Sequence, residues 1–175
     1  MTSRRALEEH RRSIEEIRNI MNSMKTLAYM ETRKLDPLLE TQDAVVRSIE
    51  TVAADFISTY PDTVPTQQPA RDAYLVVGSE RGFCGDFNET LLNHLALIQR
   101  QEPRKDFPVL VATGQKLHAC LASTTRVAAC LDGASVVEEV EGLLSRVVDT
   151  LTPLQTQYGL LNLYVLYHAI DDATV

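Results

Sequence analysis

The chain has 175 residues, of which 45% are hydrophobic, and its formal net charge is −7. This length and apolar content suffice for one modest domain with an additional segment, while the negative charge argues against a general nucleic-acid-binding protein, which should be basic. No apolar run is as long as a bilayer span. The three cysteines form no CxxC pair, so we expect neither a disulfide framework nor a zinc site.

The first third of the chain has the pattern of one long helix. Residues 4–57 contain no glycine and a single proline, and apolar side chains recur every seven residues when heptads are counted from Leu7. The polar residues at the a and d positions of this repeat are His10, Glu31 and Gln42. Such a repeat is typical of a helix that forms a left-handed coiled coil with another helix. We therefore predict a coiled-coil-type helix over residues 1–59, about 80 Å long and projecting beyond a domain about 30 Å across.

A proline interrupts this predicted helix, and a linker follows it. Asp36 and Pro37 have the form of an N-cap residue and a first helical residue, so a kink or restart is predicted near residues 36–37. The stretch 60–72 contains three prolines and no apolar periodicity, which indicates a linker.

Residues 73–175 alternate between short apolar runs and amphipathic segments. The runs predict strands at 73–77, 107–113, 126–131 and 160–170. The amphipathic segments predict helices at 88–101, 114–123 and 135–157. Strands that alternate with helices indicate an α/β domain with a mainly parallel sheet of about four or five strands. Asn88 is predicted to cap the first of these helices.

The segment GSERGFCGDFN, residues 78–88, joins the first strand to the next helix, where many α/β folds bind phosphate. Its glycines are spaced GxxxGxxG rather than GxGxxG, and the GK[ST] of a P-loop is missing. Asp86 and Glu89 would repel a phosphate at the start of the helix. A structural turn is therefore favoured, with Cys84 as a packed apolar thiol. An α/β nucleotide- or phosphate-binding module with a dimerising helix stays open as the alternative.

The sequence indicates no catalytic residues, cofactor site or metal site. The four histidines show no ligand spacing such as HxxxH, and no Ser-His-Asp or Cys-His set can be assigned. The histidines are His10, His94, His118 and His168. A plain coiled-coil scaffold is a third possible class of function.

Two motifs together resemble the gamma subunit of F-type ATP synthases. IMNSMKTLA at residues 20–28 is similar to the family's I-x-x-x-M-K-x-[VL]-A, and GSERGFCGDFN is similar to its GS-acid-RG-[LF]-CG-x-[LF]-N. The order of the segments and the later LNLYVLYH also fit, so the resemblance covers essentially the whole chain. Asp86 stands where the family usually has glycine, and YMETRKL replaces a small and basic stretch. The sequence ends at YHAIDDATV, where the family continues into a C-terminal shaft helix. Truncation and a partner in another molecule both stay open as explanations.

The resemblance implies a non-catalytic rotor-shaft subunit, the central stalk of a proton- or sodium-translocating F-type ATP synthase. In the family, a shaft helix lies beside a Rossmann-like domain, and rotation is coupled to ATP synthesis or hydrolysis on the alpha/beta hexamer. The implied partners are the alpha and beta subunits, the epsilon subunit and the membrane rotor ring, with no nucleic acid, small-molecule substrate or cofactor. The implied location is peripheral, on the cytoplasmic face of a bacterial cell membrane.

Carried over by position, the family's motifs assign two groups of residues. Met24 and Lys25 would contact the acidic loops of beta, although Met24 is equally interpretable as a d-position core residue. The residues that would shape the first turn of the domain are Gly78, Arg81, Gly82, Cys84, Gly85 and Asn88.

Overall fold

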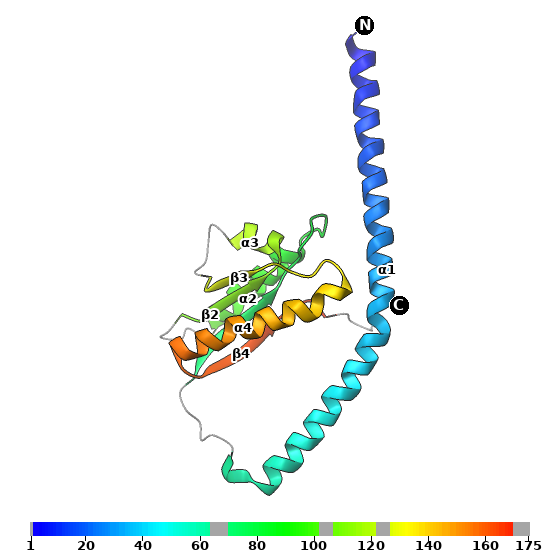
Figure 1. Cartoon of the computed structure of the whole chain (residues 1–175). Helices are drawn as coiled ribbons and strands as arrows, with labels where there is room; N and C mark the ends of the chain where they lie inside the picture. Colours follow the sequence, from blue (N-terminus) through cyan, green and yellow to red (C-terminus); the bar gives the residue numbers. More distant parts are fainter. Residues whose placement is uncertain (1, 64–69, 102–106, 122–126, 170–175) are drawn as a thin grey trace. The chain divides into compact units, whose positions relative to one another are not determined.

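The computed structural model describes residues 2–63, 70–101, 107–121 and 127–169 (Figure 1). The chain divides into two compact units, Met1–Val64 and Pro65–Val175. The division therefore falls inside the segment 60–72, for which a linker was expected. No helix in the described parts of the chain is both long and apolar enough to cross a membrane.

The first unit is dominated by one α-helix, α1, which spans Thr2–Thr59 and is followed by a 3₁₀ turn, η1, at Pro61–Thr63. The helix continues through Pro37 without a restart. Figure 1 shows that its axis bends in the middle, where the ribbon passes from blue to cyan. An internal proline lacks the N–H of the helical hydrogen bond and its ring crowds the preceding turn, which is a common cause of such a bend.

Apolar side chains of the heptad repeat are exposed along α1. Those more than 45% exposed at a and d positions are Leu7, Ile14, Ile17, Met21, Leu38, Val45, Ile49, Val52 and Phe56. Ion pairs between residues one turn apart, such as Arg12 with Glu16 at 3.3 Å, support the helix from its polar positions. The helix therefore presents a long apolar stripe, which we call the seam.

The second unit contains a four-stranded, all-parallel sheet with the strand order β3-β2-β1-β4. The strands are β1 (Arg71–Val77), β2 (Val109–Thr113), β3 (Ala129–Leu131) and β4 (Leu161–Leu166). The helices are α2 (Phe87–Gln101), α3 (Gln115–Leu121) and α4 (Val140–Tyr158), the last preceded by a 3₁₀ turn, η2, at Val137–Glu139. This architecture confirms the predicted α/β class with its parallel sheet.

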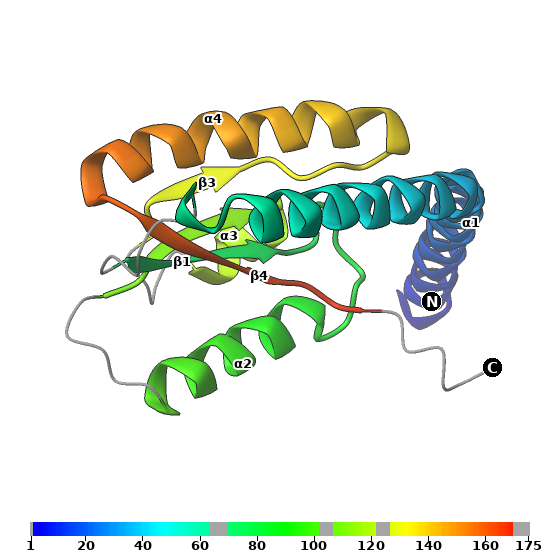
Figure 2. The same ribbon diagram turned by 90° about the horizontal axis from the view of Figure 1, so that it is seen from below.

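The direction of chain travel decides which face of the sheet each helix covers. The chain moves outward from β1 through β2 to β3, and then α4 carries it back across the sheet to β4 on the other side of β1. Because parallel crossovers are right-handed, this reversal places α4 on the face opposite α2, as Figure 2 shows. The strand order therefore reverses beside β1, at the position where doubly wound folds place their ligands.

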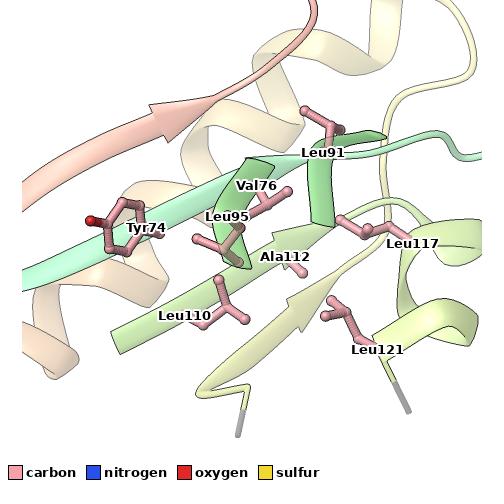
Figure 3. Packing of buried hydrophobic residues seen from close by; sticks show 8 residues of the cluster. All are labelled: Tyr74, Val76, Leu91, Leu95, Leu110, Ala112, Leu117 and Leu121. Atoms are coloured by element: carbon pink, nitrogen blue, oxygen red, sulfur yellow. The ribbon is translucent and has the colours of Figure 1, made fainter. Parts of the chain in front are cut away.

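Two apolar clusters hold the sheet to its helices. The larger one joins β1 and β2 to α2 and α3 (Figure 3), and its buried members are Tyr74, Val76, Leu91, Leu95, Leu110, Ala112, Leu117 and Leu121. On the opposite face, Leu75 and Val111 pack against Val147 of α4. Full burial of one large apolar side chain stabilises the folded state by about 1.5–3 kcal/mol. The packing of the larger cluster therefore fixes the end of β1 against α3.

Several element boundaries differ from those expected. β1 begins at Arg71 rather than at residue 73, because Arg71 pairs with Leu161 and its N–H donates to the Leu160 carbonyl at 2.8 Å. β4 ends at Leu166, whose partner Val76 lies next to the last residue of β1. Strand is assigned only to residues 129–131 of the expected 126–131. Residues 122, 123, 126 and 170 of the expected elements lie outside the described residues.

Candidate functional site

The β1–α2 turn, residues 78–86, leaves the sheet at the edge where the strand order reverses. Its first residue, Gly78, donates its N–H to the Thr113 carbonyl at 3.0 Å and so continues the pairing of β1 with β2. A Cβ on Gly78 would lie only 2.4 Å from the Cβ of Leu117 and 2.9 Å from Oδ1 of Asn88. Close packing of this turn against α3 therefore requires glycine at position 78.

Asn88 does not cap α2, contrary to the expectation from sequence. The Asp86 carbonyl accepts the first helical hydrogen bond, from Thr90 N–H at 2.9 Å, so Asp86 holds the cap position. The Asn88 side chain instead points back to the end of β1. There its Oδ1 accepts from Ser79 N–H at 2.9 Å and its Nδ2 donates to Ser79 Oγ at 2.8 Å. Asn88 therefore bonds to Ser79, outside the helix, instead of capping α2.

Glu80 links the turn to two other segments, and this role was not apparent from the sequence. Its Oε2 accepts from Gln115 N–H at 3.0 Å and from Gly133 N–H at 2.7 Å. The neighbouring Ser79 carbonyl accepts from Lys116 N–H at 3.1 Å. The turn after β1 is thereby tied to the segments that follow β2 and β3. A glycine just after each of those strands, Gly114 and Gly133, was the available sequence signal.

The tip of the turn has an unusual backbone. Phe83 and Gly85 have positive φ angles, 64° and 58°, and Phe83 is 76% exposed. A positive φ is costly for a bulky residue such as phenylalanine, so the rest of the turn must hold this conformation. Near the base of the tip, Arg81 Nε donates to Ser135 Oγ at 3.3 Å.

The prediction that Cys84 is a packed thiol is wrong. The residue is exposed, because the tip of the turn leads away from the sheet and does not reach the core. Its Sγ donates to the carbonyls of Arg81 and Gly82, at 3.4 and 3.5 Å. The thiol therefore stabilises the tip from within.

Backbone amides at this edge of the sheet are bonded to the chain's own side chains. The amides of Gln115 and Gly133 donate to Glu80, and that of Ser79 donates to Asn88. Within the described ranges, no group of three or more His, Cys, Asp or Glu side chains could hold a metal ion. The arrangement closes a turn and offers these amides to no external phosphate.

The residues expected to contact a partner lie on α1. Lys25 is exposed and Met24 is partly buried. The nearby Arg33 guanidinium lies 5.5 Å from the ring centroid of Tyr29, and Lys34 Nζ lies 2.9 Å from Glu31 Oε1. This part of α1 therefore combines basic side chains with the apolar seam.

Comparisons with known proteins agree on one family. A family model described as ATP synthase matches residues 3–174. The chain is similar to the ATP synthase gamma chains of Mycobacterium ulcerans (strain Agy99) and Mycobacterium marinum (strain ATCC BAA-535 / M), with 30% identity to each over 112 residues. The matched segment is 60% of this chain and spans only 36% of the length of each relative.

Proposed function

Because this chain belongs to the ATP synthase family and resembles its gamma chains, we propose that it is the rotor-shaft gamma subunit of an F-type ATP synthase. In this role it forms the central stalk and couples rotation to ATP synthesis or hydrolysis on an alpha/beta hexamer. The coupled ion is a proton or sodium. The observation that carries the proposal is the single helix α1, with its seam of exposed apolar side chains.

The length and surface of α1 suit a shaft. At 1.5 Å per residue, its 58 residues extend about 87 Å, several times the expected width of the second unit. A stripe of exposed a and d side chains needs a second helix to cover it. Two helices packed along a seam resist twisting and bending better than one, and transmission of torque requires that stiffness.

The second unit supports a non-catalytic role. The amides of Ser79, Gln115 and Gly133 are bonded to the side chains of Asn88 and Glu80. The carboxylates of Asp86 and Glu89 add negative charge at the start of α2, which disfavours phosphate. Nucleotide would then be bound and converted by the alpha and beta subunits. These features also disfavour the alternative of a nucleotide- or phosphate-binding module.

The proposed partners follow from the family and from the surface of α1. Met24 and Lys25 would meet the acidic loops of beta, with Lys25 supplying charge and the seam supplying apolar contact. The epsilon subunit and the membrane rotor ring would bind the foot of the stalk, and the protein would then lie peripherally on the cytoplasmic face of the membrane. The residues of the β1–α2 turn would shape the domain and take no part in catalysis.

Nucleotide titration separates the proposal from its alternative. A ligand present at a hundred times its dissociation constant raises the free energy of unfolding by about 2.7 kcal/mol, which a thermal melt resolves easily. We expect ATP, ADP and dinucleotides, with and without magnesium, to leave the melting temperature of the chain unchanged. An increase with any of them, accompanied by saturable heat in calorimetry, would favour the nucleotide-binding module.

A further inference from the structure

The side chain of Glu80 is positioned as a ligand of its own fold. Its Oε2 lies 3.0 Å from Gln115 N and 2.7 Å from Gly133 N. These two amides belong to different segments, 35 and 53 residues along the chain from Glu80. Gln115 is the first residue of α3, so its N–H has no acceptor within the helix, and Gly133 lies outside any regular element.

Two glycines let neighbouring backbone segments approach Glu80 and Ser79 closely. A Cβ on Gly133 would come within 3.1 Å of Glu80 Oε2, and a Cβ on Gly114 within 2.7 Å of the Ser79 carbonyl oxygen. Gly114 also has a φ of 102°, which strains any residue other than glycine. Two glycines thus allow three loop segments to converge on one carboxylate.

Converging backbone amides at this edge of a parallel sheet are the feature with which doubly wound folds hold external anions. We propose that Glu80 is a built-in anionic ligand, which fills the two-amide cradle and holds the β1–α2 turn closed without any bound nucleotide. Glu80 is therefore a positioning residue, because it fixes the turn that carries Arg81 and Phe83. The inference concerns the domain alone and does not depend on the proposed role in a rotary complex.

Amide exchange in the 175-residue chain, measured residue by residue by NMR, tests the contact in the unaltered protein. We expect the N–H groups of Gln115 and Gly133 to exchange slowly, although neither donates to a backbone carbonyl of the residues that the structure describes. If the Gly133 amide hydrogen in the unaltered chain exchanges as fast as one in an open loop, the proposal is overturned, regardless of the results with the variants.

Chemical rescue then tests the anionic character of the ligand. In Glu80→Ala we expect exchange at both amides to accelerate roughly tenfold or more, as expected for loss of a charge-assisted hydrogen bond. Added sodium acetate should slow it again, whereas sodium chloride at the same ionic strength should not. Glu80→Gln, which keeps an acceptor oxygen, should retain most of the protection and respond little to acetate.

A carboxylate elsewhere in the domain provides the matched control. Asp149 is exposed on α4, and its carboxylate has no hydrogen bond or ion pair to any residue that the structure describes, so Asp149→Ala should behave as the unaltered chain. Equal effects of acetate on all variants, or none on folded Glu80→Ala, would overturn the proposal. If Glu80→Ala does not fold, the unaltered chain and Glu80→Gln decide. Slow exchange of the Gln115 and Gly133 amides in the unaltered chain, largely retained in Glu80→Gln, would support the cradle, whereas full loss of protection in Glu80→Gln, or unprotected amides in the unaltered chain, would refute it.

Discussion

Replacement of Gly78 by alanine is the sharpest perturbation of the β1–α2 turn. The new Cβ would lie 2.4 Å from the Cβ of Leu117 and 2.8 Å from its Cδ2, whereas carbon atoms in good contact are about 3.5–4.0 Å apart. Leu117 is fully buried, and its Cβ cannot move unless the backbone of α3 moves. A shift of about 1 Å between β1 and α3 is therefore needed to relieve the overlap.

The expected cost of Gly78→Ala follows from two opposing effects. Overpacking a close-packed core costs about 1–3 kcal/mol and sometimes more, and a clash between two backbone-anchored atoms belongs at the upper end. Alanine also restricts the unfolded chain more than glycine does, which stabilises the folded state by about 0.4–1 kcal/mol. We therefore expect the free energy of unfolding of the second unit to fall by about 2 kcal/mol or more.

Two other glycines provide controls for this substitution. A Cβ on Gly82, in the same turn, would have Lys116 Cε as its nearest neighbour at 3.7 Å, an ordinary contact, so Gly82→Ala should be neutral or slightly stabilising. Gly142 lies within α4 and has only Arg146 Nη1 nearby, at 3.5 Å. Gly142→Ala should therefore stabilise by about 0.5–1 kcal/mol.

Urea unfolding followed by near-UV circular dichroism is the suitable assay. The chain has no tryptophan, and Tyr74 and Tyr164 stack with ring centroids 5.3 Å apart, so tyrosine signals report on the sheet. Far-UV dichroism would instead be dominated by α1. A Gly78→Ala variant as stable as Gly82→Ala would refute the packing of the turn against α3.

Three further variants test α1. The double change Ile17→Glu and Met24→Glu should make the isolated chain monomeric, because exposed apolar surface drives association at about 25 cal/mol per Å²; a monomeric unaltered chain at high concentration in analytical ultracentrifugation would contradict this. Pro37→Ala should raise the far-UV melting temperature of α1, since proline within a helix costs about 3 kcal/mol, and an unchanged or lower melting temperature would be evidence against strain at the bend. Lys25→Ala should weaken assembly with alpha and beta chains by no more than about 1 kcal/mol, as exposed ion pairs contribute little, and a larger loss in a binding titration would show that Lys25 is an anchor.

Sequence patterns predicted the elements whose periodicity or burial is strong. The seven-residue repeat predicted α1, and the apolar run at residues 73–77 predicted β1, because a parallel strand covered on both faces is apolar throughout. The predicted β3 was too long, since its three residues lie at the edge of the sheet, where Ala129 and Leu131 are only partly buried and Cys130 is exposed. β4 was also overextended, because its length depends on where its partner β1 ends.

The contacts within the site could be predicted only in part. The spacing of Gly78 and its neighbours indicated a structural turn. The carboxylate of Glu80, however, bonds to an amide 53 residues away, which no local pattern reveals. Asn88 has the propensity of a cap residue, but the tertiary bonds with Ser79 override it. Cys84 is apolar enough for a core, yet the turn carries it outward.

Stoichiometric assembly tests the proposed function most directly. The chain would be co-expressed with the alpha and beta chains of its own host, and the purified complex measured by native mass spectrometry, with the Ile17→Glu and Met24→Glu double variant as control. The proposal predicts one copy of this protein for each alpha/beta hexamer, and loss of the complex in the double variant. Absence of any complex, or several copies on each hexamer, would contradict a shaft that occupies the single central axis.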